Sequence, residues 1–219
     1  MMTNLYAVME DNKKNGTQYV DGMCAAERTL KRLIDLVGSF ILLLIFSPFI
    51  AIIAIALLMQ HDGSPIFKQE RIGYGGKPFN IYKFRSMKMN AEKNEVPMLA
   101  EKEDPRLTKV GKFLRVHHLD EIPQLWNVFV GDMSFVGPRP EREYFIHEIM
   151  KHNPDYPVLY RMRPGVTSRA TIYNGYTNTM EKMLTRLDMD LRYYRERSLL
   201  LDFKLLGLTF LKIVLGSKF

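Results

Sequence analysis

An apolar run over residues 36–59 constrains this 219-residue chain more strongly than any other feature. Its 24 residues carry no formal charge, and about 20 apolar residues are enough to span a bilayer as a helix. The run starts too late and is too long for a cleaved signal peptide. A buried core helix of this length is unusual without a single charge. The run therefore predicts a membrane helix.

Ser47 and Pro48 interrupt the run at its centre. Proline removes a backbone donor and clashes with the preceding turn, so it kinks or breaks a helix. The 11 residues on either side each make about 16 Å of helix, roughly half of a hydrocarbon core about 30 Å thick. These lengths fit a helix that enters the membrane, breaks and returns, with the Ser47 hydroxyl bonding a carbonyl that Pro48 leaves free.

Basic residues flank both ends of the run. Positive charge favours the cytoplasmic side, so a reentrant helix would keep both flanks there. A kinked helix that spans the membrane fits the residues equally well, because the charge rule weakens for long domains. The flanking residues are Arg28, Lys31 and Arg32 before the run and Lys68, Arg71, Lys77, Lys83, Arg85 and Lys88 after it.

The pattern along the chain predicts a loosely ordered tail (1–26), the broken membrane helix (27–59) and a folded domain (60–219). Asp120 as N-cap and Gly131 just past the end delimit one expected helix. The last expected helix ends in an apolar stretch that fits either an interfacial amphipathic helix or a helix docked on the core. The expected elements are strands at 65–71 and 79–85, a Gly-rich turn at 73–76, a surface loop at 90–106 and helices at 121–130, 140–151 and 180–217.

The composition limits the kinds of partner and site that this chain can have. The chain has 31 Lys and Arg against 24 Asp and Glu, a formal charge of +7, which predicts an anionic partner such as a membrane surface, nucleic acid or a phosphorylated substrate. The single cysteine, Cys24, excludes an internal disulfide framework and a zinc site built on several thiolates. The neighbouring His117 and His118 do not have zinc-ligand spacing. We find no nucleic-acid motif and no Walker or Rossmann loop.

Asp120 and Glu121 form an acidic pair in a basic neighbourhood. Asp120 could simply cap the helix that follows it, with Glu121 complementing the helix dipole. Alternatively, an ionised Asp120 beside Arg115 is suited to attack phosphorus or to bind a hard cation such as Mg²⁺.

Two sets of basic residues could recognise phosphate. Arg139 lies between Pro138 and Pro140, which fix the backbone and aim its guanidinium; the alternative is a solvated arginine in a proline-rich turn. Lys83 and Arg85 are two apart and would share one face of a strand, either as a phosphate-binding pair or as an exposed basic edge.

Several short motifs follow one another in a specific order. Together they resemble the bacterial sugar transferase family, the monotopic polyprenyl-phosphate phosphoglycosyl transferases, from about residue 28 to about residue 212. The motifs are KxxxDxxG (31–38), the Ser47-Pro48 break, FKQERIG (67–73), YKFRSM (82–87), a Gly111-x-x-x-Arg115 run into LDEIPQLWNV (119–128), GDMSFVGPRP (131–140) and RPGVT (163–167).

The resemblance implies a mainly helical α+β fold: a reentrant membrane helix, a small membrane-associated catalytic domain with a short β-hairpin, and interfacial amphipathic helices. It implies transfer of a sugar-1-phosphate from a UDP-sugar to undecaprenyl phosphate, with release of UMP, as the first step of a membrane-linked glycan. The enzyme would be monotopic in the bacterial inner membrane, with its active site on the cytoplasmic face, no nucleic-acid partner, and an oligomeric state left open.

The resemblance also assigns roles. Asp120 matches the nucleophile that carries the phospho-sugar covalently, with Glu121 beside it and Mg²⁺ assisting at the pair. The matching phosphate- and substrate-binding residues are Lys83, Arg115, Arg139 (with the nucleotide), Arg163 and Asp190.

One segment departs from the family pattern. After RPGVT the family often has Gly-Leu-Ala-Gln-Val-x-Gly-Arg, whereas residues 168–178 carry Tyr176 at the expected arginine and a new Arg169. The identity of the sugar therefore stays open. An alternative from another class is a membrane-anchored basic module that binds anionic lipid or nucleic acid without catalysis, although it leaves the ordered motifs unexplained.

Overall fold

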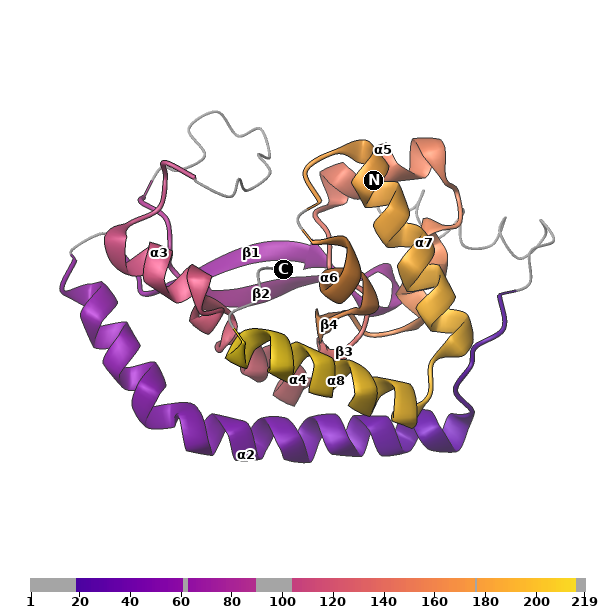
Figure 1. The fold of residues 1–219 in the computed structure, drawn as a ribbon, viewed down its shortest axis with the longest axis horizontal. Coiled ribbons are helices and arrows are strands. Elements are labelled where there is room, and N and C mark those ends of the chain that lie inside the picture. Colours follow the sequence, from indigo (N-terminus) through magenta and orange to yellow (C-terminus); the bar gives the residue numbers. More distant parts are fainter. Residues whose placement is uncertain (1–18, 61–62, 90–103, 176, 216–219) are drawn as a thin grey trace.

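The computed structural model describes residues 19–60, 63–89, 104–175 and 177–215 and shows a mainly helical α+β fold with two small sheets (Figure 1). The expected tail before residue 19 and most of the expected loop at 90–106 lie outside the described residues. The helices are α2 (Ala25–Leu58), α3 (Lys109–Val116), α4 (Gln124–Val130), α5 (Glu143–His152), α6 (Arg169–Asn174), α7 (Met180–Glu196) and α8 (Leu199–Val214). The strands are β1 (Ile66–Ile72), β2 (Pro78–Phe84), β3 (Ser134–Val136) and β4 (Gly165–Thr167), with 3₁₀ helices η1 (Tyr74–Gly76), η2 (Leu119–Glu121) and η3 (Tyr156–Arg161).

The predicted break at Ser47-Pro48 is not found: α2 is one continuous helix of 34 residues with Pro48 inside it, and it bends in its later half instead (Figure 1). Pro48 has no N–H to offer the carbonyl of Leu44, four residues earlier. The Ser47 hydroxyl donates a hydrogen bond of 2.8 Å to that carbonyl, which confirms the expected compensation. In the part of the chain that the structure describes, α2 is one helix long and apolar enough to cross a membrane.

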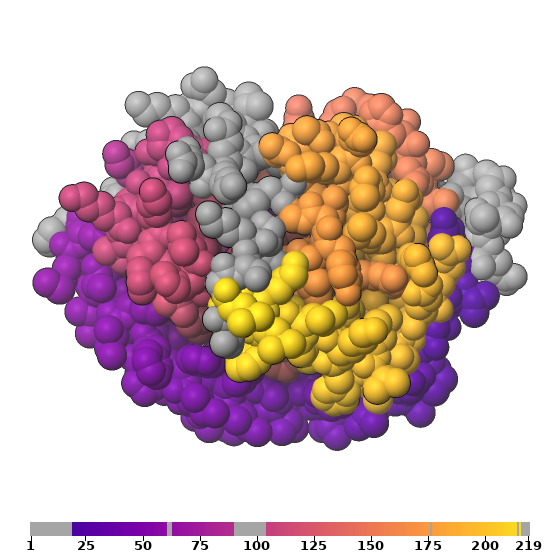
Figure 2. Space-filling model, in the orientation of Figure 1, coloured from indigo at the N-terminus to yellow at the C-terminus, as the bar shows by residue number. Residues whose placement is uncertain are grey.

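Both ends of α2 contact the same folded domain. Near its start, the Lys31 ammonium lies 2.5 Å from a carboxylate oxygen of Asp202 on α8. Near its end, Leu57 packs with Phe84 and Leu114 in a small apolar cluster. The strands and the other helices accordingly lie on the concave side of the bend, and α2 forms a band along one edge of the molecule (Figures 1 and 2).

The predicted β-hairpin is present, each strand within one residue of its expected bounds. Strands β1 and β2 pair antiparallel from Ile66 opposite Phe84 to Ile72 opposite Pro78. Asn127 of α4 holds the hairpin from one side: it is fully buried, its Oδ1 accepts from the Tyr82 N–H (3.1 Å) and its Nδ2 donates to the Asn80 carbonyl (2.7 Å). Helix α4 is therefore fixed directly to β2.

A parallel pair, β3 and β4, joins two of the sequence motifs. Ser134 lies opposite Gly165 and Val136 opposite Thr167. The backbones approach so closely that a Cβ on Gly165 would lie 2.1 Å from the Gly137 nitrogen. Glycine is required at this crossing, which brings the loop of Arg139 beside the segment that begins with Arg163.

Three helix predictions need correction. Asp120 does not cap a helix at 121–130: it lies in η2, and α4 begins only at Gln124 with Pro123 as its N-cap, although Gly131 (φ 99°) ends it as expected. Helix α5 begins three residues later than expected because the Ile72 N–H bonds the Glu141 carbonyl and keeps that residue out of the helix. The C-terminal helix is two helices, because Arg197 is extended and Ser198 caps α8.

The main core lies where α5, η3, α7 and α8 meet. Helix α8 contributes Leu205 to it (2% exposed) and presents Leu200, Phe203 and Phe210 on its other side, each more than half exposed. The docked-helix alternative is thus confirmed for one face. The other face is apolar and exposed, and its place in the membrane interface stays a prediction.

We predict that Asn127→Ala destabilises the protein by roughly 2–4 kcal/mol, because two buried backbone groups of β2 lose their partner. Thermal unfolding in detergent should show this as a lower Tm. Asn174→Ala is the matched control, because the Asn174 side chain is only partly buried and makes a solvent-exposed hydrogen bond, to the Lys182 carbonyl. Equal Tm values for the two variants would contradict the role given to Asn127.

Candidate active site

The acidic pair lies in a tight connection between α3 and α4. His118 precedes η2 with a φ of 55°, and within the described ranges no other non-glycine residue has a positive φ. This left-handed conformation is uncommon for a residue with a side chain. It turns the chain so that Asp120 is nearly buried (7% exposed) and Glu121 follows in the same turn.

Lys83 of β2 joins this turn. Its ammonium lies 2.5 Å from a carboxylate oxygen of Glu121, and both side chains are about four-fifths buried. The shared strand face expected for Lys83 and Arg85 is not found, because β2 ends at Phe84 and the Arg85 Nε donates to the Ser64 carbonyl at 2.7 Å. Only Lys83 of the two contacts the acidic pair.

Burial and charge set the ionisation of Asp120. Burial raises the pKa of Asp120 to about 6, the negative charge of Glu121 adds to this, and Lys83 and Arg115 oppose it. Asp120 is therefore mainly ionised at pH 7. Arg115 of α3 also has a buried Nη1 without a hydrogen-bond partner among the described residues, so a donor is available near the Asp120 carboxylate.

Glu121 has the opposite behaviour. Burial by itself would raise its pKa, but Lys83 and Arg139 outweigh burial and hold the pKa of Glu121 well below its ordinary value.

Burial lowers the pKa of His118, with Lys83 and Arg139 adding to the effect and Glu121 opposing it, so its imidazole is neutral at pH 7. The structure thus brings together an ionised acidic pair, one neutral histidine and three cations.

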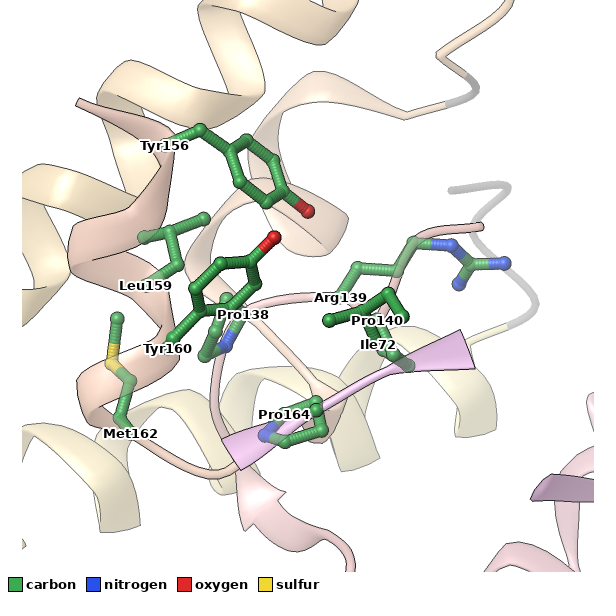
Figure 3. A pocket seen from close by; sticks show the side chains of 10 residues that line it. Ile72, Pro138, Arg139, Pro140, Tyr156, Leu159, Tyr160, Met162 and Pro164 are labelled. Carbon is green, nitrogen blue, oxygen red and sulfur yellow. The ribbon is translucent and has the colours of Figure 1, made fainter. Parts of the chain in front are cut away.

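Arg139 is exposed, whereas Pro138 and Pro140 on either side are buried. This exposure fits both readings of the segment, an aimed guanidinium and a solvated arginine in a proline-rich turn. A shallow pocket lies behind this segment, lined by the flanking prolines, Tyr156 and Tyr160. Figure 3 shows that the Arg139 side chain points away from this pocket. Its charge acts on Glu121 and His118 instead.

The acidic pair could hold Mg²⁺ only together with other ligands. Within the described segments, no three His, Cys, Asp or Glu side chains are grouped to hold a metal ion. Mg²⁺ is nevertheless commonly bound by one or two protein carboxylates plus water and substrate phosphates. Two adjacent carboxylates, with a spare Arg115 donor beside them, fit that kind of site.

Arg163 has a different setting from the one expected. Its Nε donates to the Gly131 carbonyl at 2.8 Å, and its guanidinium lies over the Tyr74 ring, 5.3 Å from the centroid. Arg32 of α2 donates to the Val128 and Phe129 carbonyls at 2.7 and 2.8 Å. Two arginines thus satisfy carbonyls at the C-terminal end of α4, where a helix leaves such groups unbonded.

Asp190 belongs to a second charged cluster, the Glu141 cluster, which consists of Arg71, Glu141, Arg186 and Asp190. The Glu141 carboxylate lies 2.6 Å from Arg186 and 3.6 Å from Arg71. Asp190 is 2% exposed, and burial raises its pKa to about 7, with Arg186 opposing and Glu141 adding to the rise. None of its recorded interactions is with Asp120 or Glu121.

The segment that departs from the family pattern is only partly described, since Tyr176 lies outside the described residues. Arg169 is paired with Glu196 at 2.6 Å, which ties α6 to the end of α7. The sequence did not predict the roles of His118, Arg71, Glu141 and Arg186. The only signal in the sequence was that Arg71 and Glu141 lie inside or just after ordered motifs.

A sequence model of the family described as bacterial sugar transferase matches residues 26–216. The chain is 41% identical over 196 residues to the UDP-glucose:undecaprenyl-phosphate glucose-1-phosphate transferase of Escherichia coli (strain K12), which covers 89% of this chain and 42% of that protein. It is 35% identical over 187 residues to the UDP-N-acetylgalactosamine-undecaprenyl-phosphate N-acetylgalactosaminephosphotransferase of Aeromonas hydrophila, covering 85% and 44%. A putative undecaprenyl-phosphate N-acetylgalactosaminyl 1-phosphate transferase of Bacillus subtilis (strain 168) is 40% identical over 153 residues, covering 68% and 85%. The chain thus spans less than half the length of the first two relatives.

The buried Asp190 should make the stability of the folded protein depend on pH. In the unfolded chain an aspartate has a pKa near 3.9, whereas burial raises the pKa of Asp190 to about 7 in the folded protein. Between these values the folded state binds the extra proton, so this group's contribution to stability is present below about pH 4 and is lost as pH rises towards 7. Asp190→Asn removes the titration. The Tm of this variant relative to wild type should therefore rise by roughly 5 °C between pH 5 and pH 8.

The exposed Asp188 on the same helix provides the control. Asp188→Asn should keep a constant Tm difference from wild type over this pH range. If Asp190→Asn behaves in the same way, the burial of a protonated carboxyl group at this position is refuted.

Proposed function

Because the chain belongs to the bacterial sugar transferase family, we propose that it transfers a sugar-1-phosphate from a UDP-sugar to undecaprenyl phosphate and releases UMP. The product would begin a membrane-linked glycan. The observation that carries the proposal is the nearly buried Asp120 carboxylate, ionised beside Glu121 with Lys83 and Arg115 around it. The relatives' names include both glucose and N-acetylgalactosamine, so they leave the sugar open.

In the first step, a carboxylate oxygen of Asp120 attacks the β-phosphorus of the UDP-sugar. A bond forms between that oxygen and phosphorus, and the bond from phosphorus to the bridging oxygen breaks. UMP leaves with the bridging oxygen and the electron pair, and Asp120 retains the phospho-sugar. A covalent intermediate of this kind divides one transfer between two bulky anions into two displacements.

In the second step, a terminal oxygen of undecaprenyl phosphate attacks the same phosphorus. The bond from phosphorus to Asp120 breaks, which regenerates the carboxylate and yields the lipid diphosphate-linked sugar. Neither step requires a proton from the protein, because UMP and the Asp120 carboxylate both leave as anions.

The surrounding residues would stabilise the transferring phosphoryl group. The unpartnered Arg115 Nη1 is available to a phosphate oxygen, and Lys83 holds Glu121 in its charged form. Arg139, aimed outward between two prolines, would bind the nucleotide part of the donor. Asp120 and Glu121 would hold Mg²⁺, which when bound would neutralise charge on the donor diphosphate.

We propose further that α2 is reentrant, so that the enzyme is monotopic on the cytoplasmic face of the inner membrane. The contacts of both ends of α2 with one domain support this, since a spanning helix would put its ends on opposite sides. Exposed apolar residues on three further helices would lie in the interface. They are Phe113 and Val116 on α3, Trp126 and Val130 on α4, and Leu200, Phe203, Phe210 and Leu211 on α8.

Asp120→Asn tests the mechanism. The substitution preserves size, and Asp120 caps no helix, so the variant should fold. Without the nucleophile, its rate of UMP release should fall by a factor of roughly 10³ or more. Intact-protein mass spectrometry should detect one phospho-sugar on wild type incubated with UDP-sugar and Mg²⁺ in the absence of lipid, on the peptide with Asp120, and none on the variant.

Asp188→Asn, an exposed site on α7, should behave as wild type in both assays. An active Asp120→Asn enzyme without an adduct would rule out the covalent mechanism. Absence of UMP release by wild type across many UDP-sugars would instead favour the non-catalytic membrane module.

Thiol labelling tests the reentrant helix. The native Cys24 precedes α2 and is exposed, and Gln60 follows α2; Cys24→Ser with Gln60→Cys moves the thiol to the other end. An impermeant reagent should leave both proteins unlabelled in spheroplasts and label both in inverted membrane vesicles. Both thiols should react after detergent is added, which controls for accessibility. Labelling of the two proteins from opposite sides would establish a spanning helix.

A further inference from the structure

We propose that Glu141 is a positioning residue for donor binding: its carboxylate holds Arg71 and Arg186 so that the neighbouring backbone presents Arg139 to the UDP-sugar. This inference rests on the proposed function, and it concerns a residue that touches neither the acidic pair nor the exposed surface. Glu141 is 5% exposed.

Glu141 connects elements from three parts of the chain. One carboxylate oxygen lies 2.6 Å from a guanidinium nitrogen of Arg186 on α7, and the other lies 3.6 Å from Arg71 on β1. The second terminal nitrogen of Arg186 donates to the Thr177 hydroxyl at 2.6 Å. The cluster therefore joins the hairpin, the segment after Arg139 and the start of the C-terminal helices.

The same contacts fix the backbone next to Arg139. Arg71 donates to the Pro140 carbonyl at 3.3 Å, and the Ile72 N–H donates to the Glu141 carbonyl at 3.0 Å. On the other side, the Gly165 N–H donates to the Pro138 carbonyl at 2.9 Å. Figure 3 shows Pro140 beside Ile72 and the Arg139 side chain extending away from the pocket. Arg71 thus bonds one of the three backbone carbonyls that fix the segment around Arg139.

Charge explains why an acid is needed at this position. Burial lowers the pKa of Arg71 to about 10. The negative charge of Glu141 opposes this shift, whereas three nearby positive charges add to it, those of Arg139, Arg142 and Arg186. Without the Glu141 charge, two buried guanidiniums would repel each other and the exposed Arg139. A buried ion that loses its partner is strongly unfavourable, so Arg71 would move and release the Pro140 carbonyl.

Glu141→Gln tests the inference, since glutamine keeps the size and removes the charge. At saturating undecaprenyl phosphate, we expect the KM for the UDP-sugar to rise roughly tenfold while kcat changes by less than about twofold. A purely structural effect would reduce the active fraction, lowering kcat and leaving KM unchanged. Glu148→Gln is the matched control, because it removes an ion pair, to Lys151, at an exposed site on α5; its KM should equal that of wild type.

A double-mutant cycle tests whether Glu141 acts through Arg139. Arg139→Ala alone should also raise the donor KM roughly tenfold, and adding Glu141→Gln should raise it no further, whereas independent residues would give roughly a hundredfold increase. If Glu141→Gln does not fold, Arg71→Lys replaces it, because lysine keeps the charge but has one nitrogen in place of the two with which Arg71 bonds Gln69 and reaches Pro140 and Glu141. Arg71→Lys should raise the KM about threefold in wild type and leave it unchanged in the Arg139→Ala background.

The outcomes separate this inference from the proposed function. An active wild type whose donor KM is unaffected by Glu141→Gln or Arg71→Lys, or whose effects multiply with Arg139→Ala, would refute positioning and leave the transferase activity intact. A wild type that releases no UMP from any UDP-sugar would refute both.

Discussion

The two hydrogen bonds from Arg32 to the last turn of α4 connect the apolar helix to the chemistry. An apolar helix is stable in lipid, whereas a charged site requires water or polar partners. Helix α4 contacts both: its C-terminal carbonyls accept hydrogen bonds from Arg32 of α2, and its N-terminus follows the turn that contains Asp120. Arg163 adds a third bond at the Gly131 carbonyl. Helix carbonyls that need donors thus become the attachment points for α2. The rest of the site builds outward from α4, because Asn127 also fixes β2 and thereby places Lys83.

The acidic pair shows how one cation can divide the behaviour of two adjacent carboxylates. Lys83 bonds Glu121 directly at 2.5 Å, so the pKa of Glu121 falls, whereas Asp120 is buried beside that negative charge and its pKa rises to about 6. Like charges this close resist ionising together unless cations compensate them. The result is a carboxylate that is ionised near neutral pH but poorly solvated, which favours its use as a nucleophile over its use as a structural cap.

Local patterns in the sequence predicted the elements that depend on local chemistry. The hairpin, the Gly131 helix end, the Pro48 bend and the Ser47 hydrogen bond follow from residue type and spacing. The start of α4 did not, because a preference for aspartate at N-caps was overridden by the left-handed His118 and by Pro123. Lys83 was predicted at the site, whereas Arg85, Arg163 and Asp190 were placed elsewhere by contacts with partners distant in sequence. Such contacts depend on which backbone carbonyls and carboxylates the fold leaves unpaired, and spacing alone carries no information about them.

Part of the chain's positive charge serves the fold and is not available to a partner. A net charge of +7 suggested a basic surface that attracts anions. Several of the contributing side chains instead serve the fold: Arg32 and Arg163 bind helix carbonyls, and Arg186 is paired inside the protein. The cations at the acidic pair are few, namely Lys83, Arg115 and Arg139. A small number of positioned cations in a partly buried site stabilises a transferring phosphoryl group better than a diffuse basic surface, because the buried ones act at low effective dielectric and at a fixed distance. Recognition of the donor would then depend on how firmly those few side chains are held.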